Sequence, residues 1–234
     1  LCSFPRLLAM VNEVEGIERI RFTTSHPKDL SDELIRSFAV LDKLCRHFHL
    51  PVQSGSSRIL ERMNRRYTRE RYMERVARLR ETAEDMAITT DIIAGFPGET
   101  ADDFEETLSL VRDVGFDGIF AFMYSDRSLA PAAAFPGKVP QAEKSLRLNA
   151  LLELQKGISE SRNRALVGQT VSVLVEGPSK RPSLSTGVTG DNEKQWTGRT
   201  TTNRVVNFLA PEGSFPGNAI KAGDHDRPRR RPDG

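Results

Sequence analysis

The sequence predicts an α/β domain followed by a small all-β domain. In the first 140 residues, four short runs rich in β-branched and aromatic residues alternate with helical patterns. From Val171 onward the apolar residues instead recur at every second position, which is the period of a half-buried strand. No apolar run approaches the roughly 20 residues that span a bilayer, so we expect a soluble chain without membrane contact.

The net charge and the number of cysteines exclude several classes of protein, among them polycationic nucleic-acid binders and disulfide-rich domains. The 234 residues include 34 basic and 32 acidic side chains, a net charge of +2, so any contact with RNA must come from local patches. Cys2 and Cys45 are too far apart for a C-x-x-C metal motif, and two cysteines do not make a disulfide framework. This cysteine usage favours a reducing, cytoplasmic setting.

The four β-rich runs are the predicted strands of the first domain, at residues 17–25, 47–53, 86–96 and 116–125. Strands joined by crossover helices pair in parallel, and four strands do not close a barrel. A half-barrel and an open doubly wound sheet both remain compatible with this pattern. In either architecture the polar clusters that follow the runs lie at the carboxyl ends of the strands, where chemistry takes place.

Helix starts are readable between these runs. The opening residues 1–16 read as the middle of an amphipathic helix, and because the chain does not begin with Met we expect a fragment of a longer protein. Two further helices are predicted to run to about residues 45 and 85. The predicted N-caps are Ser31, Thr68 and Thr100, the last with Asp103 at its third helical position.

The C-terminal third changes character. A charged amphipathic helix over residues 141–167 reads as a connector that ends before Gly168. Beyond it, Val171, Val173 and Val175 share one face of a strand, and a second β-run covers residues 204–209. A polar loop is predicted over 178–195 and a disordered basic tail over 223–234. After Gly213, proline and glycine break the alternation, so we expect an incomplete or irregular barrel.

Four longer motifs carry a family resemblance. RIRFTTSHP, HLPVQSGSSRILERMNR, TDIIAGFPGET and TGRTTTNRVVNF occur in this order between about residues 17 and 213. Together they resemble the radical S-adenosylmethionine (SAM) methylthiotransferases of the tRNA 2-methylthio-N6-isopentenyladenosine (dimethylallyladenosine) synthase type. Several long motifs in a fixed order are far more specific than a single short one.

The resemblance implies an architecture. Family members combine an N-terminal domain holding an auxiliary [4Fe-4S] cluster, a six-stranded radical-SAM partial barrel with a second cluster, and a TRAM β-barrel that binds tRNA. By this resemblance, residues 1–140 are the last four strands of the partial barrel, 141–166 a connecting helix, 167–222 the TRAM-like domain and 223–234 the tail. Cys2 and Cys45 match neither cluster motif, so no metal ligand or catalytic residue is predicted here and the chain alone is expected to be inactive.

The resemblance also implies a SAM pocket at the strand ends. Glycines in the 95–99 turn allow close backbone approach to a ligand, and an aspartate inside an apolar strand needs a partner. The predicted pocket residues are Ser25, His26, His49, Gln53, Ser54, Asp91, Gly95, Phe96, Gly98, Glu99, Ser125 and Arg127. Alternatives stay open: a merely connecting turn, a core role for His49, a helix-dipole role for Glu99, and either a cofactor carboxylate or an RNA phosphate as the partner of Arg127.

Predicted RNA contacts fall in the β-domain. They are Arg199, Asn203, Arg204 and Phe208, on the edge of a small barrel. A solvated charged face is the alternative for the arginines, and core packing is the favoured alternative for Phe208. The chain departs from the family at residues 128–130, where Ser-Leu-Ala stands in place of the usual Gly-Thr pair.

The predicted function is methylthiolation of isopentenyladenosine in the tRNA anticodon loop. SAM is the expected cofactor, tRNA and a flavodoxin- or ferredoxin-type electron donor the expected partners, and a monomer the expected state. Threonylcarbamoyl-adenosine or a ribosomal-protein aspartate are alternative targets. A non-catalytic RNA-binding fragment and an unrelated aldolase-like barrel fragment are the alternatives from other classes.

Overall fold

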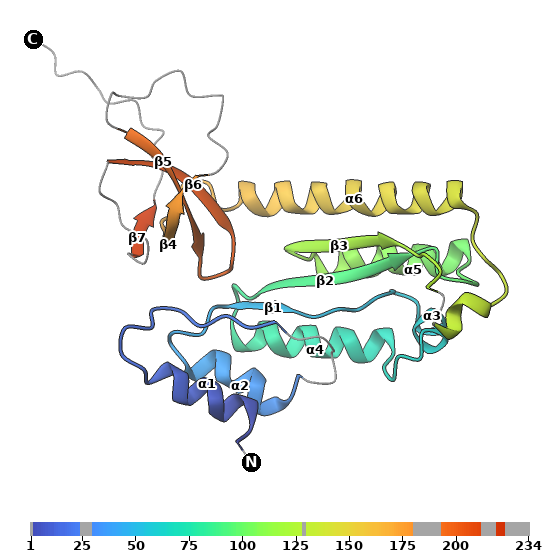
Figure 1. The fold of residues 1–234 in the computed structure, drawn as a ribbon, viewed down its shortest axis with the longest axis horizontal. Coiled ribbons are helices and arrows are strands. Elements are labelled where there is room, and N and C mark those ends of the chain that lie inside the picture. Colours follow the sequence, from blue (N-terminus) through green and yellow to red (C-terminus); the bar gives the residue numbers. More distant parts are fainter. Residues whose placement is uncertain (1, 24–29, 128–129, 180–192, 212–218, 223–234) are drawn as a thin grey trace, which may run out of the picture. The chain divides into compact units, whose positions relative to one another are not determined.

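The computed structural model describes residues 2–23, 30–127, 130–179, 193–211 and 219–222 (Figure 1). The chain divides into two compact units, Leu1–Asn163 and Arg164–Gly234. The helices are α1 (Phe4–Asn12), α2 (Asp32–Val40), α3 (Ser57–Arg62), α4 (Arg69–Thr82), α5 (Ala101–Val114) and α6 (Gln141–Arg164), with a 3₁₀ turn at Pro131–Ala134. The strands are β1 (His47–His49), β2 (Ala87–Ala94), β3 (Gly118–Met123), β4 (Val171–Pro178), β5 (Glu193–Thr200), β6 (Val205–Pro211) and β7 (Ala219–Ala222).

The first unit is built on a parallel sheet of order β1-β2-β3. Alternation along β2 buries Ile88, Thr90 and Ile92, whereas Thr89 and Asp91 stay partly exposed on the opposite face. The buried face joins a core that includes residues of α4 and α5, and Figure 1 shows α4 running beside β1 and α6 beside β3. One face of the sheet is thus packed, and the other remains open.

The helix starts follow the predictions. Ser31, Thr68 and Thr100 all accept hydrogen bonds as N-caps, and Thr100 forms a reciprocal capping box with Asp103. The opening helix, however, has its own N-cap at Ser3, so it begins there instead of continuing an earlier turn.

Two helices end earlier than predicted. Helix α2 stops at Val40 and not near residue 45, since Leu41 turns to an extended conformation and Cys45 then donates its N–H to the carbonyl of Ile20. Helix α4 ends at Thr82, since Ala83 turns to an extended conformation before β2. The short helix α3 was not predicted.

The first two predicted strands are shorter than expected. In the described part of residues 17–25, pairing is limited to one parallel bridge between Ile20 and Leu44; residues 24–29 are not described. The run 47–53 pairs as β1 and then again at a bridge between Gln53 and Ile92. Pro51 lies between the two pairings and lacks the N–H that a continuous ladder needs.

Helix α6 is more than a connector. Leu151 is fully buried in the core of the first unit, and Gln155 Nε2 donates to the carbonyl of Phe116 over 2.9 Å. The compact unit accordingly extends to Asn163, past the predicted boundary at residue 140.

The second unit is an antiparallel sheet of order β6-β5-β4-β7. Val173 and Val175 are buried as the alternation predicts, and Val175 packs with Trp196 and Phe208. Strand β5 lies inside the sheet, so its residues 197–200 are not at an edge, and it begins at residue 193 within the predicted loop. After Gly213, where an incomplete or irregular barrel was expected, strand β7 pairs with β4. Residues 180–192 and the tail 223–234 are not described.

Among the residues described, no helix is both long and apolar enough to cross a membrane.

Candidate functional site

The carboxyl ends of β1, β2 and β3 meet at a pocket of about 520 Å³. Parallel strands end at the same edge of a sheet, so the polar groups that follow them converge. The lining residues are Gln53, Arg65, Asp91, Ile93, Phe96, Phe122, Met123, Tyr124, Ser125, Arg127, Ala130 and Ala132. Of the predicted pocket residues, the structure brings together Gln53, Asp91, Phe96, Ser125 and Arg127.

The turn after β2 forms one wall. Gly95 and Gly98 have φ of +76° and +84°, a left-handed backbone that side chains disfavour. The Gly98 N–H donates to the carbonyl of Gly137 over 2.7 Å, which ties the turn to a second loop. Between the glycines, the buried ring of Phe96 meets Tyr124 edge to face at 5.2 Å. The glycines therefore shape the wall, and Phe96 supplies its surface.

Glu99 holds this turn from behind. Its Oε2 accepts hydrogen bonds from the N–H of Gly95 and from Arg147 Nη1, both at 2.7 Å, and its side chain is 1% exposed. Burial raises the pKa of Glu99 above its usual range, although the contacts with Arg147 and the Gly95 N–H act in the opposite direction. Because the carboxylate is enclosed by these partners, it positions the turn and does not line the pocket.

Two arginines of α3 fix the carbonyls of the same turn. Arg58 Nη2 donates to the carbonyl of Gly98 over 2.6 Å, and Arg62 Nε donates to that of Pro97 over 3.1 Å. Arg58 also pairs with the buried carboxylate of Asp103. Burial acts to raise the pKa of Asp103, but the hydrogen bonds from Arg58, Thr100 and Ser56 outweigh it and hold that pKa below its usual range.

Sequence reasoning missed Arg58, Arg62 and Arg147. Arg58 and Arg62 are four residues apart, so they face the same way on a helix, and this spacing was the available signal for them. Their partners on the turn lie 35 to 40 positions away in the chain.

Asp91, which lies in an apolar strand, has His49 as its polar partner. His49 Nε2 lies 3.4 Å from Asp91 Oδ1, and His49 Nδ1 lies 3.0 Å from Thr89 Oγ1. The imidazole also meets the ring of Phe120 edge to face. His49 is outside the pocket lining, so the structure places it as a neighbour of Asp91 on the open face of the sheet.

The other predicted pocket residues of the first unit differ in whether they reach the pocket. Gln53 has a left-handed φ of +72° and lines the pocket, whereas Ser54 is fully buried with its hydroxyl 3.4 Å from that of Thr107. Ser54 is therefore directed away from the pocket, toward α5. Ser25 and His26 lie outside the described residues.

In the second unit, the predicted RNA-contact residues partly come together at the β5–β6 turn. Arg199 Nε is 3.2 Å from Glu176 Oε1, and its Nη1 donates to Asn203 Oδ1 over 3.2 Å. The backbone N–H of Arg204 donates to Thr200 Oγ1 over 3.0 Å. Phe208 is apart from this group, since it packs against the small core of the unit.

Comparison with known proteins defines the class of the first unit. Residues 3–111 match the Radical SAM superfamily. Coproporphyrinogen III oxidase from Escherichia coli, a radical SAM enzyme, has a similar fold, with a TM-score of 0.54 and 12% identity over 84% of this chain and 50% of that one. Residues 3–111 of the first unit are thus similar to radical SAM domains.

More particularly, the chain resembles proteins named tRNA-2-methylthio-N(6)-dimethylallyladenosine synthase. It is 60% identical to that of Desulfosudis oleivorans over 95% of its own length and 47% of the relative's. With that of Moorella thermoacetica it shares 53% identity over 88% of this chain and 44% of the relative. The family resemblance predicted from the motifs is confirmed, and the chain spans about half the length of these relatives.

Proposed function

We propose that this chain is part of a tRNA methylthiotransferase that adds a methylthio group to N6-dimethylallyladenosine in the anticodon loop. The observation that carries the proposal is the 60% identity, over 95% of the chain, to a protein named for that product. The convergence of polar groups at the ends of three parallel strands supports a ligand pocket in the first unit.

The proposed architecture is the last four strands of a six-stranded partial barrel followed by a TRAM-type β-barrel. Three observations support it. The parallel sheet has one open face, Ile20 forms a parallel bridge with Leu44, and the second unit is an antiparallel sheet. The predicted boundaries at residues 140 and 166 shift to the end of α6 in this proposal.

The pocket suits SAM, the cosubstrate that the radical SAM superfamily implies. Phe96, Phe122 and Tyr124 offer aromatic surface for the adenine, and the Gln53 amide can both donate to and accept from ribose hydroxyls. Asp91 offers a carboxylate for the ammonium group of the methionyl end. When bound, SAM supplies the methyl group and the adenosyl radical of the reaction. The chain's own residues bind and orient it.

Iron–sulfur chemistry is also implied by the superfamily. Cys2 is exposed and Cys45 is buried, and within the described ranges no three histidine, cysteine or acidic side chains are grouped so as to hold a metal ion. The described residues thus do not fit a cluster, and we assign them no iron ligand and no electron-transfer step. A flavodoxin- or ferredoxin-type donor and a monomeric state remain predictions.

The test is nucleoside mass spectrometry of tRNA from a strain lacking the gene. We expect loss of the 2-methylthio mark with accumulation of N6-dimethylallyladenosine, restored by the full-length gene. The same gene carrying Asp91→Asn should restore little of the mark. A matched control, Asp85→Asn, removes an exposed carboxylate that pairs with Arg46 outside the pocket, and it should restore the mark fully.

Other outcomes of the mass spectrometry would indicate a different substrate or a different function. Loss of the mark from threonylcarbamoyl-adenosine, or from a ribosomal protein, would reassign the target. An unchanged nucleoside and protein profile would contradict the methylthiotransferase proposal and favour a purely RNA-binding role.

A further inference from the structure

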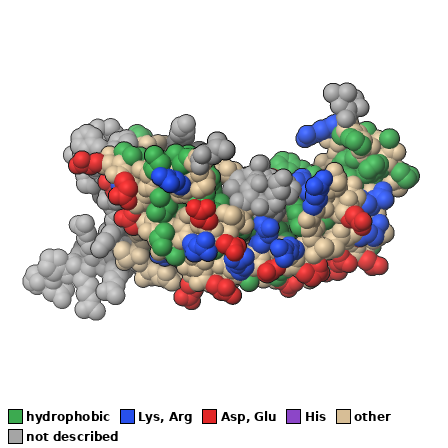
Figure 2. All heavy atoms as spheres, turned by 90° about the horizontal axis from the view of Figure 1, so that it is seen from below, with side chains coloured by type: hydrophobic (Ala, Val, Ile, Leu, Met, Phe, Trp, Pro, Cys, Tyr) green, Lys and Arg blue, Asp and Glu red, His purple; other side chains and the backbone are tan. Residues whose placement is uncertain are grey.

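Eight of the eighteen arginines described in the first unit are engaged with carboxylates. Arg46, Arg58, Arg69, Arg71, Arg78, Arg112, Arg147 and Arg162 each lie within 4 Å of one. Basic and acidic side chains are correspondingly interspersed over the face shown in Figure 2. Others donate to backbone carbonyls, as Arg62 does to Pro97 and Arg80 to Val114. The arginines of interest are therefore those near the pocket that have neither kind of partner.

Three arginines around the pocket are of this kind. Among the described residues, no ion pair or hydrogen bond engages the guanidinium of Arg65, Arg66 or Arg127. Arg65 and Arg127 line the strand-end pocket. Arg65 and Arg66 also line an adjoining groove of about 420 Å³. Arg65 thus joins the two cavities into one basic path.

The groove keeps a positive balance. Its lining comprises Ser57, Arg58, Glu61, Arg65, Arg66, Tyr67 and Thr68. Glu61 is the carboxylate in that lining, against three guanidiniums, of which Arg58 is occupied by Asp103. Two cations therefore remain to attract an anion, and one carboxylate opposes them.

The backbone that carries the two arginines is held at both ends. The N–H of Arg65 donates to the carbonyl of Leu60, and the N–H of Asn64 to that of Glu61, which together form the Schellman ending of α3. Asn64 takes the left-handed conformation that this motif requires, with φ of +56°. Two residues further on, the Tyr67 hydroxyl donates to the carbonyl of Val52 over 3.1 Å. A segment fixed in this way loses little entropy when it binds.

We propose that the groove between Ser57 and Thr68 binds backbone phosphates of the RNA beside the nucleotide that enters the strand-end pocket. This inference rests on the proposed function. Guanidinium groups match phosphate oxygens in a planar, two-pronged geometry. The single carboxylate of SAM does not account for the set, since Arg66 lines the groove and not the pocket.

The arginines of the β-domain differ from those of the groove in how far they are already engaged. There, Arg199 is already engaged by Glu176 and Asn203, so binding a phosphate would compete with existing contacts. Arg65 and Arg66 bind phosphate without breaking an ion pair. We therefore place a share of the RNA contact in the first unit, where the sequence analysis offered an RNA phosphate only as one of two possible partners of Arg127.

The experiment measures binding of a fluorescent RNA hairpin with the anticodon-loop sequence to the full chain over a salt series. Each phosphate contact on single-stranded RNA contributes about 0.7 to the slope of log affinity against log salt. The double variant Arg65→Gln/Arg66→Gln should bind about tenfold more weakly, with a slope lower by about 1.4.

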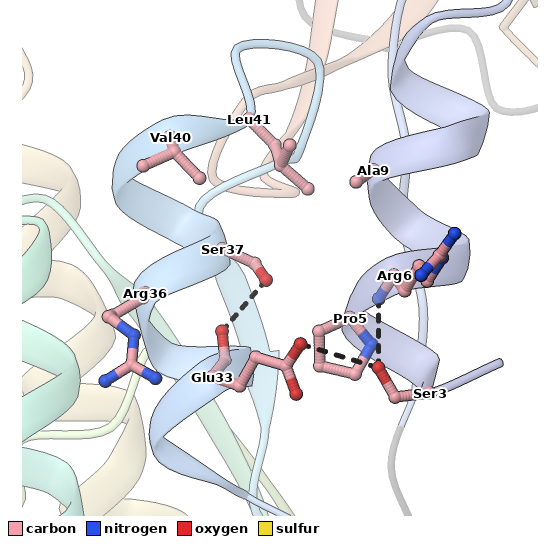
Figure 3. A pocket seen from close by; sticks show the side chains of 9 residues that line it. All are labelled: Ser3, Pro5, Arg6, Ala9, Glu33, Arg36, Ser37, Val40 and Leu41. Atoms are coloured by element: carbon pink, nitrogen blue, oxygen red, sulfur yellow. Dashed lines mark hydrogen bonds between the residues drawn. The ribbon is translucent and has the colours of Figure 1, made fainter. Parts of the chain in front are cut away.

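The matched control is Arg6→Gln/Arg36→Gln. These arginines line a different pocket, between α1 and α2, and in Figure 3 no dashed line reaches either guanidinium. The control removes the same net charge and should leave the slope unchanged. An equal loss in both variants would assign the effect to net charge and overturn the proposal.

Two further results separate the inference from the proposed function. If the wild-type chain binds the RNA and Arg65→Gln/Arg66→Gln binds it equally well, the groove proposal is overturned while the function stands. Equilibrium dialysis with SAM supplies the second arm, with the single variant Arg66→Gln, because Arg66 lines the groove and not the strand-end pocket. We expect Arg66→Gln to retain SAM binding and to weaken RNA binding. Loss of SAM binding with unchanged RNA binding would assign Arg66 to the cofactor and overturn the proposal.

Discussion

The turn after β2 and the loop after β3 line the same pocket but are held very differently. The turn at residues 95–99 is fixed by Glu99, by the paired Arg147, and by Arg58 and Arg62 on its carbonyls. In the loop, Ser125 and Arg127 are exposed, and the neighbouring ion pair of Asp126 with Lys138 is exposed as well. One wall is therefore rigid, and the other is a solvated rim.

This difference between the turn and the loop indicates that the turn residues shape the pocket, whereas the loop residues contact the ligand. A buried charged pair is costly to place, so it persists where it fixes a geometry. An exposed arginine remains available for a partner that arrives from outside. Substitutions in the turn should thus change stability first, and substitutions in the rim should change binding alone.

The largest effect is expected for Arg147→Met. The substitution leaves the Glu99 carboxylate buried without its cation, which costs about 3–5 kcal/mol of unfolding free energy. Urea unfolding followed by helical circular dichroism measures it. Lys156→Met is the matched control on the same helix, since Lys156 and its partner Glu153 are both exposed, and it should cost much less. Equal losses in the two variants would show that the turn is not specially held.

Adding Glu99→Gln to Arg147→Met should recover part of the loss. The double variant no longer contains an unpaired buried charge, whereas the hydrogen bond to the Gly95 N–H can be kept by the amide oxygen. Failure to recover would indicate that lost packing, not the charge, dominates the effect.

A smaller effect is expected for Gly95→Ala. The left-handed φ costs about 1–2 kcal/mol for a residue with a side chain. The new Cβ would also lie 2.4 Å from Lys144 Cγ, so that side chain must move. Gly168→Ala is the matched control, with φ of +82° and nothing within 4 Å of the added atom.

The unfolding of the two units can be followed separately in the two glycine variants. Trp196 is the one tryptophan of the sequence and reports the second unit by fluorescence, and the helical signal reports mainly the first. We expect Gly95→Ala to cost more than Gly168→Ala, and Lys144→Ala to remove the excess. A Gly95→Ala cost no greater than the control would refute the close approach of α6 to the turn.

The smallest stability effect is expected for Arg127→Gln. No ion pair among the described residues depends on this side chain, so the unfolding free energy should change by less than about 0.5 kcal/mol. Binding of SAM or RNA to the full chain should weaken nevertheless. A loss of stability comparable to that of Arg147→Met would remove the distinction between wall and rim.

Local rules explain what was predictable. The caps at Ser31, Thr68 and Thr100 depend on side chains within three residues of the backbone groups they satisfy. The buried face of β4 follows from its alternation. The convergence of Gln53, Asp91 and Arg127 follows from parallel pairing, which the crossover helices already require.

Side-chain direction at the strand ends was not predictable in the same way. Gln53 and Ser54 are neighbours, yet Gln53 lines the pocket and Ser54 is buried against Thr107. Gln53 has a left-handed backbone and pairs again with β2 at Ile92, and this local geometry separates the directions of the two side chains. Phe208, for which core packing was the favoured interpretation, does join a core whose other members come from β4 and β5.

By itself, the sequence determined the alternation of strands and helices, the helix caps and the family, because each depends on neighbouring residues or on whole motifs. The tertiary structure alone decided which charges are buried and which stay unpaired. Glu99 and Arg147 are 48 positions apart, and Arg58 and Asp103 are 45. Coulomb energy and desolvation act through distance in space, and chain folding sets that distance independently of separation along the sequence.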